Sequence, residues 1–135
     1  MRPPLAEELD LQPHPEGKWY RQTWRSPTTV TLPDGRVRPT ATLIYFLLPA
    51  GESSAWHRVR SDEVWLAHRG EVRLELGSSG SRPQSGVHLT VGTGEGAAQV
   101  LVPADVWQRT LPSGEDALVN CLVSPGFDFE DFELA

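Results

Sequence analysis

The 135-residue sequence predicts one all-β domain built as a closed or nearly closed double sheet. Twelve glycines and twelve prolines separate short apolar or alternating runs, a pattern typical of sandwiches and barrels. The chain is long enough for one real core but short for two domains, so residues 1–135 are interpreted as a single domain. Closing the sheet also removes the exposed strand edges that would otherwise pair with other chains.

One short helix is expected near the N-terminus, at residues 5–11, where it ends against the proline-containing segment 12–15. The sequence Pro33-Asp34-Gly35 predicts a hairpin turn, because glycine adopts a positive φ at no steric cost. Residues 77–86 are rich in glycine and serine and predict a surface loop. The remaining runs predict strands at residues 19–24, 28–32, 40–48, 55–60, 63–68, 71–76, 87–91, 98–102, 107–111 and 117–123.

The run 40–48 is apolar on both of its alternating faces. One face carries Leu43, Tyr45 and Leu47, and the other carries Ile44 and Phe46. This pattern predicts a central strand with one face inside the barrel and the other covered by a second sheet or a partner subunit.

Charge and composition exclude several classes of function. The net charge is −6 and no basic face stands out, so binding to nucleic acid or to an anionic membrane is not expected. The longest apolar run, residues 43–48, is too short to span a bilayer, and the first twelve residues lack a secretory apolar core. Cys121 is the only cysteine and is expected to be a small buried hydrophobe. These features indicate a soluble cytoplasmic protein.

A metal-site spacing appears in residues 51–70. Histidines at i and i+2 of a strand point the same way, and a glutamate on the next strand can return to the same place. Here Gly51 is followed at fixed intervals by His57, Val59, Glu63 and Gly70. The spacing resembles the first motif of the cupin superfamily, with Val59 at the position of the second histidine.

Residues 96–108 resemble the second cupin motif in altered form. Asp105 stands where a glycine is expected, and Gln108 stands where the third histidine belongs. Of the four ligands that the resemblance implies, only His57 and Glu63 remain, with Gln108 as a weak third. A divalent metal is therefore not favoured as the cofactor, although His57, Glu63 and Gln108 could hold one loosely.

The sequence around both motifs resembles that of one cupin subfamily, cupin family 5, also called domain of unknown function 985. This resemblance implies a double-stranded β-helix, the cupin jelly-roll barrel, which is usually a homodimer and has a small-molecule pocket inside the barrel. Lys18, like Asp105, departs from a glycine expected at its position. The matching stretches are residues 13–21, 42–48, 54–65, 68–70, 102–108 and 124–135.

His57 and Glu63 are the candidate catalytic residues. Facing each other across a metal-free pocket, they would form a hydrogen-bonded acid/base unit, and charge pairing would raise the pKa of His57. His57 would then act as the base and Glu63 would tune it. The alternative is that the pair only ties two strands together. The candidate substrate-binding residues around this pair are Tyr45, Val59, Trp65 and Gln108.

Other residues are expected to serve the structure. Trp107 should point away from the pocket, while His68 and His88 should lie on the outside and His14 in a loop without ligand spacing. The three phenylalanines of the tail, Phe127, Phe129 and Phe132, are expected to pack on the barrel or on a neighbouring subunit, with the acidic residues between them facing out.

Three functions agree with these features. The first is isomerase, epimerase or lyase chemistry on a sugar or another small polar metabolite. The second is a non-catalytic module that binds or senses a small molecule. The third is a weakly metal-dependent cupin enzyme, which the missing histidines disfavour.

Overall fold

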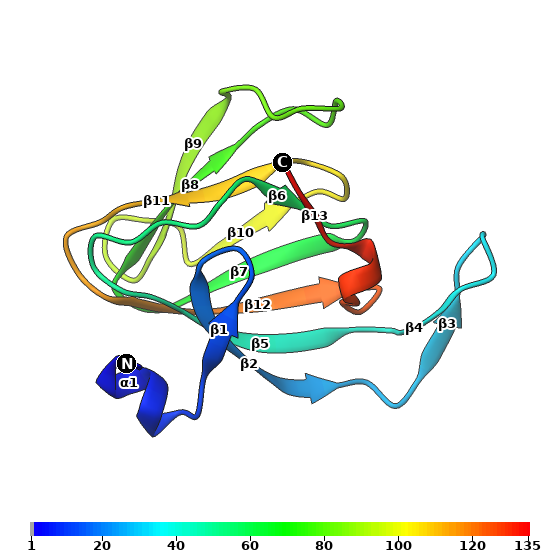
Figure 1. Cartoon of the computed structure of the whole chain (residues 1–135), viewed down its shortest axis with the longest axis horizontal. Coiled ribbons are helices and arrows are strands. Elements are labelled where there is room, and N and C mark those ends of the chain that lie inside the picture. The colour runs from blue at the N-terminus through cyan, green and yellow to red at the C-terminus, as the bar shows by residue number, and fades with distance from the viewer. Residues whose placement is uncertain (1) are drawn as a thin grey trace.

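The computed structural model describes residues 2–135 as two antiparallel sheets that face each other in a jelly roll (Figure 1). The first sheet contains, in spatial order, β1 (Gln12–His14), β2 (Lys18–Arg25), β5 (Thr42–Leu48), β12 (Ala117–Ser124), β7 (Asp62–Arg69) and β10 (Gln99–Val102). The second contains β13 (Glu133–Leu134), β6 (His57–Arg58), β11 (Gln108–Leu111), β8 (Glu71–Leu76) and β9 (Val87–Gly92). The predicted all-β fold with one short N-terminal helix is confirmed.

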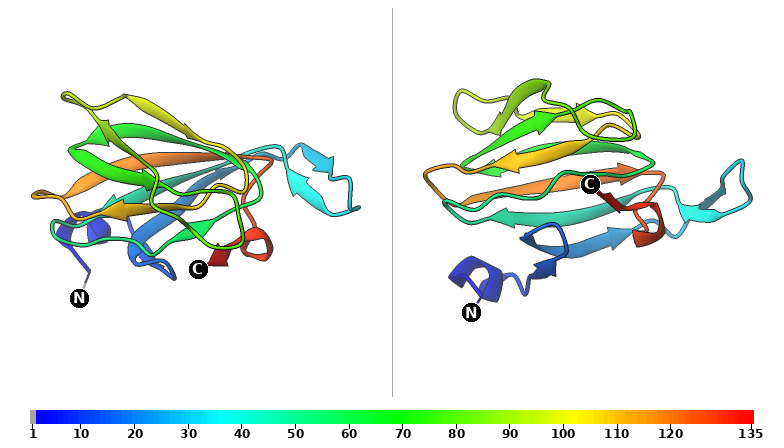
Figure 2. Two further views of the ribbon diagram at one scale, coloured as in Figure 1. Left: turned by 90° about the horizontal axis from the view of Figure 1, so that it is seen from above. Right: turned by 45° about the horizontal axis from the view of Figure 1, so that its top comes forward.

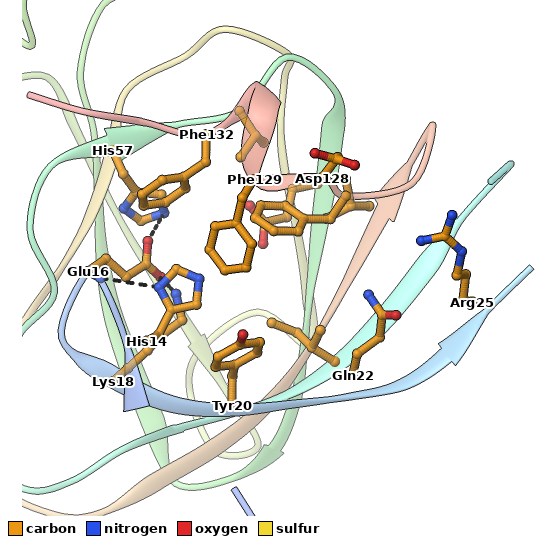
Figure 3. A pocket seen from close by; sticks show the side chains of 15 residues that line it. His14, Glu16, Lys18, Tyr20, Gln22, Arg25, His57, Asp128, Phe129 and Phe132 are labelled. Carbon is orange, nitrogen blue, oxygen red and sulfur yellow. Dashed lines mark hydrogen bonds and ion pairs between the residues drawn. The ribbon is translucent and has the colours of Figure 1, made fainter. Parts of the chain in front are cut away.

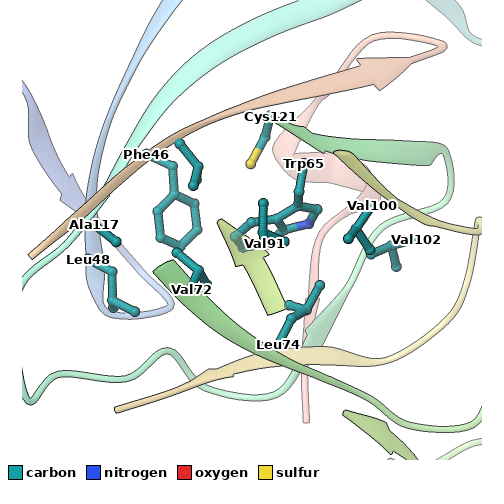
Figure 4. Close-up of a cluster of buried hydrophobic side chains, with 11 residues drawn as sticks. Phe46, Leu48, Trp65, Val72, Leu74, Val91, Val100, Val102, Ala117 and Cys121 are labelled. Carbon is teal, nitrogen blue, oxygen red and sulfur yellow. The ribbon is translucent and has the colours of Figure 1, made fainter. Parts of the chain in front are cut away.

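The core lies between the two sheets (Figure 4). Phe46 and Trp65 project from the first sheet, and Val72 and Leu74 project from the second. All four side chains are buried, as is Cys121 beside them. Burial of large aromatic and aliphatic side chains is the main force that holds the sheets together.

The outer face of the first sheet is covered by the helix α1 (Pro4–Glu8) and by the residues that follow it. Ala6 and Leu11 pack on Leu47 and Leu118, and Tyr45 packs against the same cluster. The chain's own N-terminus, not a second sheet, covers this part of β5, while Leu43 and Tyr45 stay partly exposed. Tyr45 also does not enter the barrel, since it points to the same side of the strand as Leu47.

Three local expectations can be compared with the structure. The turn at residues 33–35 joins β3 (Thr29–Thr31) to β4 (Val37–Pro39), and Gly35 has a φ of 89°. This hairpin projects from the body of the barrel (Figure 2). Asp105 has a φ of 68°, which explains why the resemblance places a glycine there and why an aspartate is tolerated. The predicted strand 55–60 is reduced to the two residues of β6.

The C-terminal tail returns to the second sheet through the 3-10 helix η1 (Phe129–Asp131) and then β13, which pairs with β6. Asp131 is buried and forms ion pairs with Arg36 and Arg38 of the β3–β4 hairpin. The expectation that all acidic residues of the tail face out is thus wrong for Asp131. Among the described residues, no helix is long and apolar enough to cross a membrane.

Candidate functional site

A cavity of about 370 Å³ opens between β2 and the C-terminal tail (Figure 3). Phe129 and Phe132 cover it from one side, and Tyr20 lies on the other. One end of it, the polar end, holds His14, Glu16, Lys18 and His57, whereas Gln22, Arg25 and Asp128 lie away from that end. The lining residues are His14, Glu16, Lys18, Tyr20, Gln22, Arg25, Ile44, His57, Val59, Glu63, Val123, Phe127, Asp128, Phe129 and Phe132.

The β1–β2 hairpin supplies three of the polar groups. His14 and Lys18 are directly paired across the hairpin, and Glu16 lies at its tip. Gly17 allows this tight turn because it has a φ of 96°, a conformation that other residues rarely adopt. The carbonyl of Glu16 accepts a 2.8 Å hydrogen bond from the backbone N–H of Ala55, which holds the tip beside β6. The hairpin therefore places Glu16 next to His57.

Both ring nitrogens of His57 have a polar neighbour. Its Nε2 lies 2.7 Å from Oε2 of Glu16, and its Nδ1 lies 2.9 Å from the carbonyl oxygen of Ala55. Since the carbonyl can only accept, Nδ1 carries a proton. A proton on Nε2 or on the Glu16 carboxyl group would turn the contact between these two groups into a hydrogen bond.

The two histidines of the site resist protonation. Burial, followed by the nearby charge of Lys18, lowers the pKa of His57 to about 4, while the Ala55 carbonyl and Glu63 act in the opposite direction. Burial, Lys18 and His57 together lower the pKa of His14 to about 2. The expectation of a raised pKa for His57 is therefore wrong, because the cost of burying the charge exceeds the attraction of the carboxylates.

Lys18 brings an amine into the barrel. Its side chain is buried, contacts the carboxylate of Glu16 and places Nζ 4.2 Å from the centre of the Phe46 ring. Burial lowers its pKa to about 7, against the raising effects of Cys121 and Glu63. An amine with a pKa of about 7 is present in both its ammonium and its neutral form near pH 7, and the neutral form can act as a base or a nucleophile.

Glu63 lines the cavity but does not bond to His57. Its Oε1 accepts a 2.8 Å hydrogen bond from Nε2 of Gln108, whose Oε1 accepts a 3.0 Å bond from the indole N–H of Trp65. Gln108 and Trp65 are both fully buried and do not line the cavity. The structure therefore corrects the expected His57–Glu63 pair to a His57–Glu16 pair and places Trp65 and Gln108 behind the pocket wall.

The residues present do not fit a divalent metal. The Nε2 of His57 is engaged by Glu16, the amide of Gln108 is used by Glu63 and Trp65, and the Lys18 side chain contacts Glu16 within the same polar end. Within residues 2–135, no group of three or more His, Cys, Asp or Glu side chains is arranged to hold a metal ion. A cation would meet the Lys18 ammonium and would have to displace existing hydrogen bonds.

The tail forms the aromatic cover of the cavity. Phe132 stacks on the ring of His57 with centroids 5.7 Å apart, and Phe129 lies 5.6 Å from the ring of His14. Phe127 contacts Phe129 edge to face at 4.9 Å. These contacts agree with the expected packing of the tail on the barrel, and they fix the two histidines from the solvent side.

The structure brings His57, Val59 and Glu63 to one cavity, together with His14, Glu16, Lys18 and Tyr20, which were not among the candidate site residues. His14 was expected in a loop without a partner, whereas it lies in β1 opposite Lys18. One signal was present: Lys18, Tyr20 and Gln22 alternate along a strand and so share one face.

Trp107 points away from the pocket as predicted, and the imidazoles of His68 and His88 lie on exposed parts of the chain.

Three comparisons agree with this architecture. Residues 4–135 match the family Cupin_5, described as Cupin superfamily (DUF985). An uncharacterized protein of Saccharomyces cerevisiae, YML079W, is 29% identical over 144 residues, covering 94% of this chain and 71% of that protein. A hypothetical protein from Leishmania major has a TM-score of 0.84 and 32% identity over 96% of this chain and 84% of its own. Protein SO0799 from Shewanella oneidensis has a TM-score of 0.83 and 32% identity, covering 100% and 85%.

Proposed function

We propose that this chain, which belongs to the Cupin_5 family (DUF985) of the cupin superfamily, binds a small metabolite in the cavity beside His57 and moves a proton on it. The reaction class is that of an isomerase or epimerase acting on a sugar or a comparable small polar molecule. The volume of about 370 Å³ is within the range of small-molecule sites, which is roughly 300–1,000 Å³.

The observation that supports proton transfer is the 2.7 Å contact between His57 and Glu16 at the wall of the pocket. A proton held on either of these two buried groups can be given to a bound molecule or taken from it with little reorganisation. His57 acts as the acid/base group in this proposal, and Glu16 takes the tuning role that the sequence analysis gave to Glu63. Tyr20 and Phe129 offer flat surfaces on which a ring can stack.

The test is hydrogen exchange from D₂O into candidate substrates, followed by ¹H NMR. Fructose 6-phosphate is a suitable probe because its open-chain form carries C–H groups next to a ketone, which are acidic enough to exchange. Exchange that occurs with the native protein and is lost in both His57→Gln and Glu16→Gln supports the proposal. Exchange that survives both substitutions would contradict it.

A second candidate is a binding module without catalysis. One observation favours it: both nitrogens of His57 already have a polar neighbour, in Ala55 and in Glu16, so no free base faces the ligand in this conformation. A probe that raises the melting temperature of the protein but undergoes no exchange and no turnover would identify this function.

We also propose that the chain acts as a homodimer, as the sequence resemblance implies. Large apolar side chains remain exposed on β2 and on the β3–β4 hairpin: Trp24 is 46% exposed and Val37 is 56% exposed. Burial of these residues against a second copy would remove them from water. Sedimentation velocity tests this directly, and a monomer at all concentrations would contradict it.

A further inference from the structure

We propose that Lys18 forms a covalent imine with an aldehyde or ketone bound in the cavity. This inference goes beyond the proposed proton transfer, because the bond would form whether or not the bound molecule is isomerised. It assigns a carbonyl group to the ligand and gives the amine of Lys18 the role of a nucleophile.

The position of Lys18 suits this reaction. Lys18 begins β2 and lies on the same face of the strand as Tyr20, so its side chain enters the barrel at the polar end of the cavity. It is buried, with 6% of the residue exposed. The ring of Phe46 lies beneath Nζ, so water has little access from that side. A buried amine that lines a cavity is placed to attack a bound molecule.

The amino-acid composition of the chain also distinguishes Lys18. Lys18 is the only lysine of the chain, and the other eleven of the twelve basic residues are arginines. An arginine would serve equally well as a buried cation and would pair better with a carboxylate. Arginine cannot lose its proton or act as a nucleophile, so the one position occupied by lysine is also the one position where that chemistry is available.

The charged and titratable groups that face Nζ also suit this reaction. Glu16 contacts the amine, Glu63 and Cys121 lie nearby, and His57 and His14 complete the polar end. The carboxylates favour the ammonium form, while burial favours the neutral amine and brings the pKa of Lys18 to about 7. Glu16 can accept the proton that the ammonium must lose before attack.

The step is balanced without any further reactant. The neutral amine of Lys18 adds to the carbonyl carbon, the C–N bond forms, and the carbonyl oxygen takes a proton from the His57–Glu16 pair. The nitrogen then returns one proton to the His57–Glu16 pair, and the pair passes a proton to the hydroxyl group, which leaves as water as the C–O bond breaks. The iminium that remains returns its last proton to the pair and becomes the neutral imine. No oxidation or reduction occurs, and hydrolysis by water reverses the sequence.

Reductive trapping of the native protein tests this inference. Benzaldehyde and, separately, pyruvate are added at pH 7 with sodium cyanoborohydride, which reduces imines to stable amines. Only two amines are present, Lys18 and the N-terminus, so intact mass and peptide mapping separate them. We expect the adduct on Lys18 to form at least tenfold faster than the adduct on a surface lysine, because at pH 7 far more of a lowered-pKa amine is neutral.

The surface reference is the double variant Lys18→Met/Arg60→Lys, which moves the only lysine to an exposed position. Lys18→Arg keeps the charge and should give no adduct at residue 18. The proposal would be overturned if adducts of the native protein were confined to the N-terminus. It would also be overturned if the adduct on Lys18 formed no faster than the adduct on the surface lysine. Trapping of the imine does not require turnover, so the two proposals can fail separately. If Lys18 is trapped but no deuterium enters a substrate, only the proton-transfer function is overturned. If deuterium enters but Lys18 is not trapped, only the imine is overturned.

Discussion

The Nε2 of His57 lies 2.7 Å from Oε2 of Glu16, although His57 is in β6 and Glu16 is at the tip of the β1–β2 hairpin, 41 positions earlier in the sequence. The backbone bond from Ala55 to Glu16 and the bond from His57 to the Ala55 carbonyl join these two segments into one unit. The geometry of the polar end of the pocket therefore depends on the hairpin as much as on the sheet.

A double-mutant cycle should detect this pairing. The variants Glu16→Gln, His57→Gln and their combination keep side-chain volume nearly constant. We expect a coupling free energy on the order of 1–3 kcal/mol, because the two groups are in direct contact in a buried site. Urea unfolding at pH 7 gives the measurement. The matched cycle with Glu63→Gln and His57→Gln should give a smaller coupling, and the reverse order would contradict the pairing seen here.

The sequence predicted the barrel and part of the site for a clear physical reason. Alternation along a strand fixes the face on which a side chain lies, so Glu63 and Trp65 were both placed inside. Alternation does not show, however, whether an inward side chain lies in the packed core or at the cavity. Trp65 lies in the core, whereas Glu63 reaches the cavity. The contribution of Glu16 could not be predicted, because a segment with two prolines and a glycine is typical of a loop. The place of that loop in the fold depends on tertiary contacts.

Stability should fall as the pH decreases from 7 to 5. The folded-state pKa of His57 is lowered from 6.5 to about 4, so the unfolded chain binds a proton in this range and the folded chain does not. For this residue alone, the free energy of unfolding is expected to fall by about 2 kcal/mol between pH 7 and pH 5.

Urea unfolding at the two pH values provides the measurement, and His57→Gln should lose that part of the decrease. If the native protein instead becomes more stable on acidification through this window relative to His57→Gln, a proton resides on Nε2 of His57 and the ion pair with Glu16 outweighs burial.

Replacing Gln108 by leucine should destabilise the fold. The change leaves the indole N–H of Trp65 and the carboxylate of Glu63 without their 3.0 Å and 2.8 Å partners. Unpaired buried polar groups cost about 1–3 kcal/mol each, so a loss on the order of 3 kcal/mol is expected in chemical unfolding. Gln84→Leu, at an exposed position, serves as the control and should change stability little. Equal effects of the two substitutions would contradict a structural role for Gln108.

Divalent metals should not stabilise the native protein. Added Mn²⁺, Ni²⁺ or Zn²⁺ is expected to leave the melting temperature unchanged, because the ligating atoms of His57 and Gln108 already have polar partners and Lys18 repels a cation. Lys18→Ala removes this repulsion and should allow metal-dependent stabilisation. A rise in melting temperature for the native protein, of the size seen with the variant, would show that the amine does not keep the metal out.

Asp131 should control the aromatic cover of the pocket. It is buried between Arg36 and Arg38, with its Oδ2 3.1 Å from Nε of Arg38, and it anchors the 3-10 helix that carries Phe129. Breaking a buried ion pair from one side costs about 3–5 kcal/mol when desolvation is complete, so we expect Asp131→Asn to lose on the order of 2 kcal/mol at this partly screened site.

The loss should be local to the tail, because the partners of Asp131 lie in the β3–β4 hairpin and not in the barrel sheets. Hydrogen exchange of the amides of Asp131 and Phe132, which bond to Asp128 and Phe129, should accelerate while exchange in β7 and β12 stays slow. Asp34→Asn is the matched control, because Asp34 pairs with the same Arg36 at an exposed position and should have almost no effect. If both variants leave the tail equally protected, the phenylalanines alone hold the cover in place and Asp131 is not its anchor.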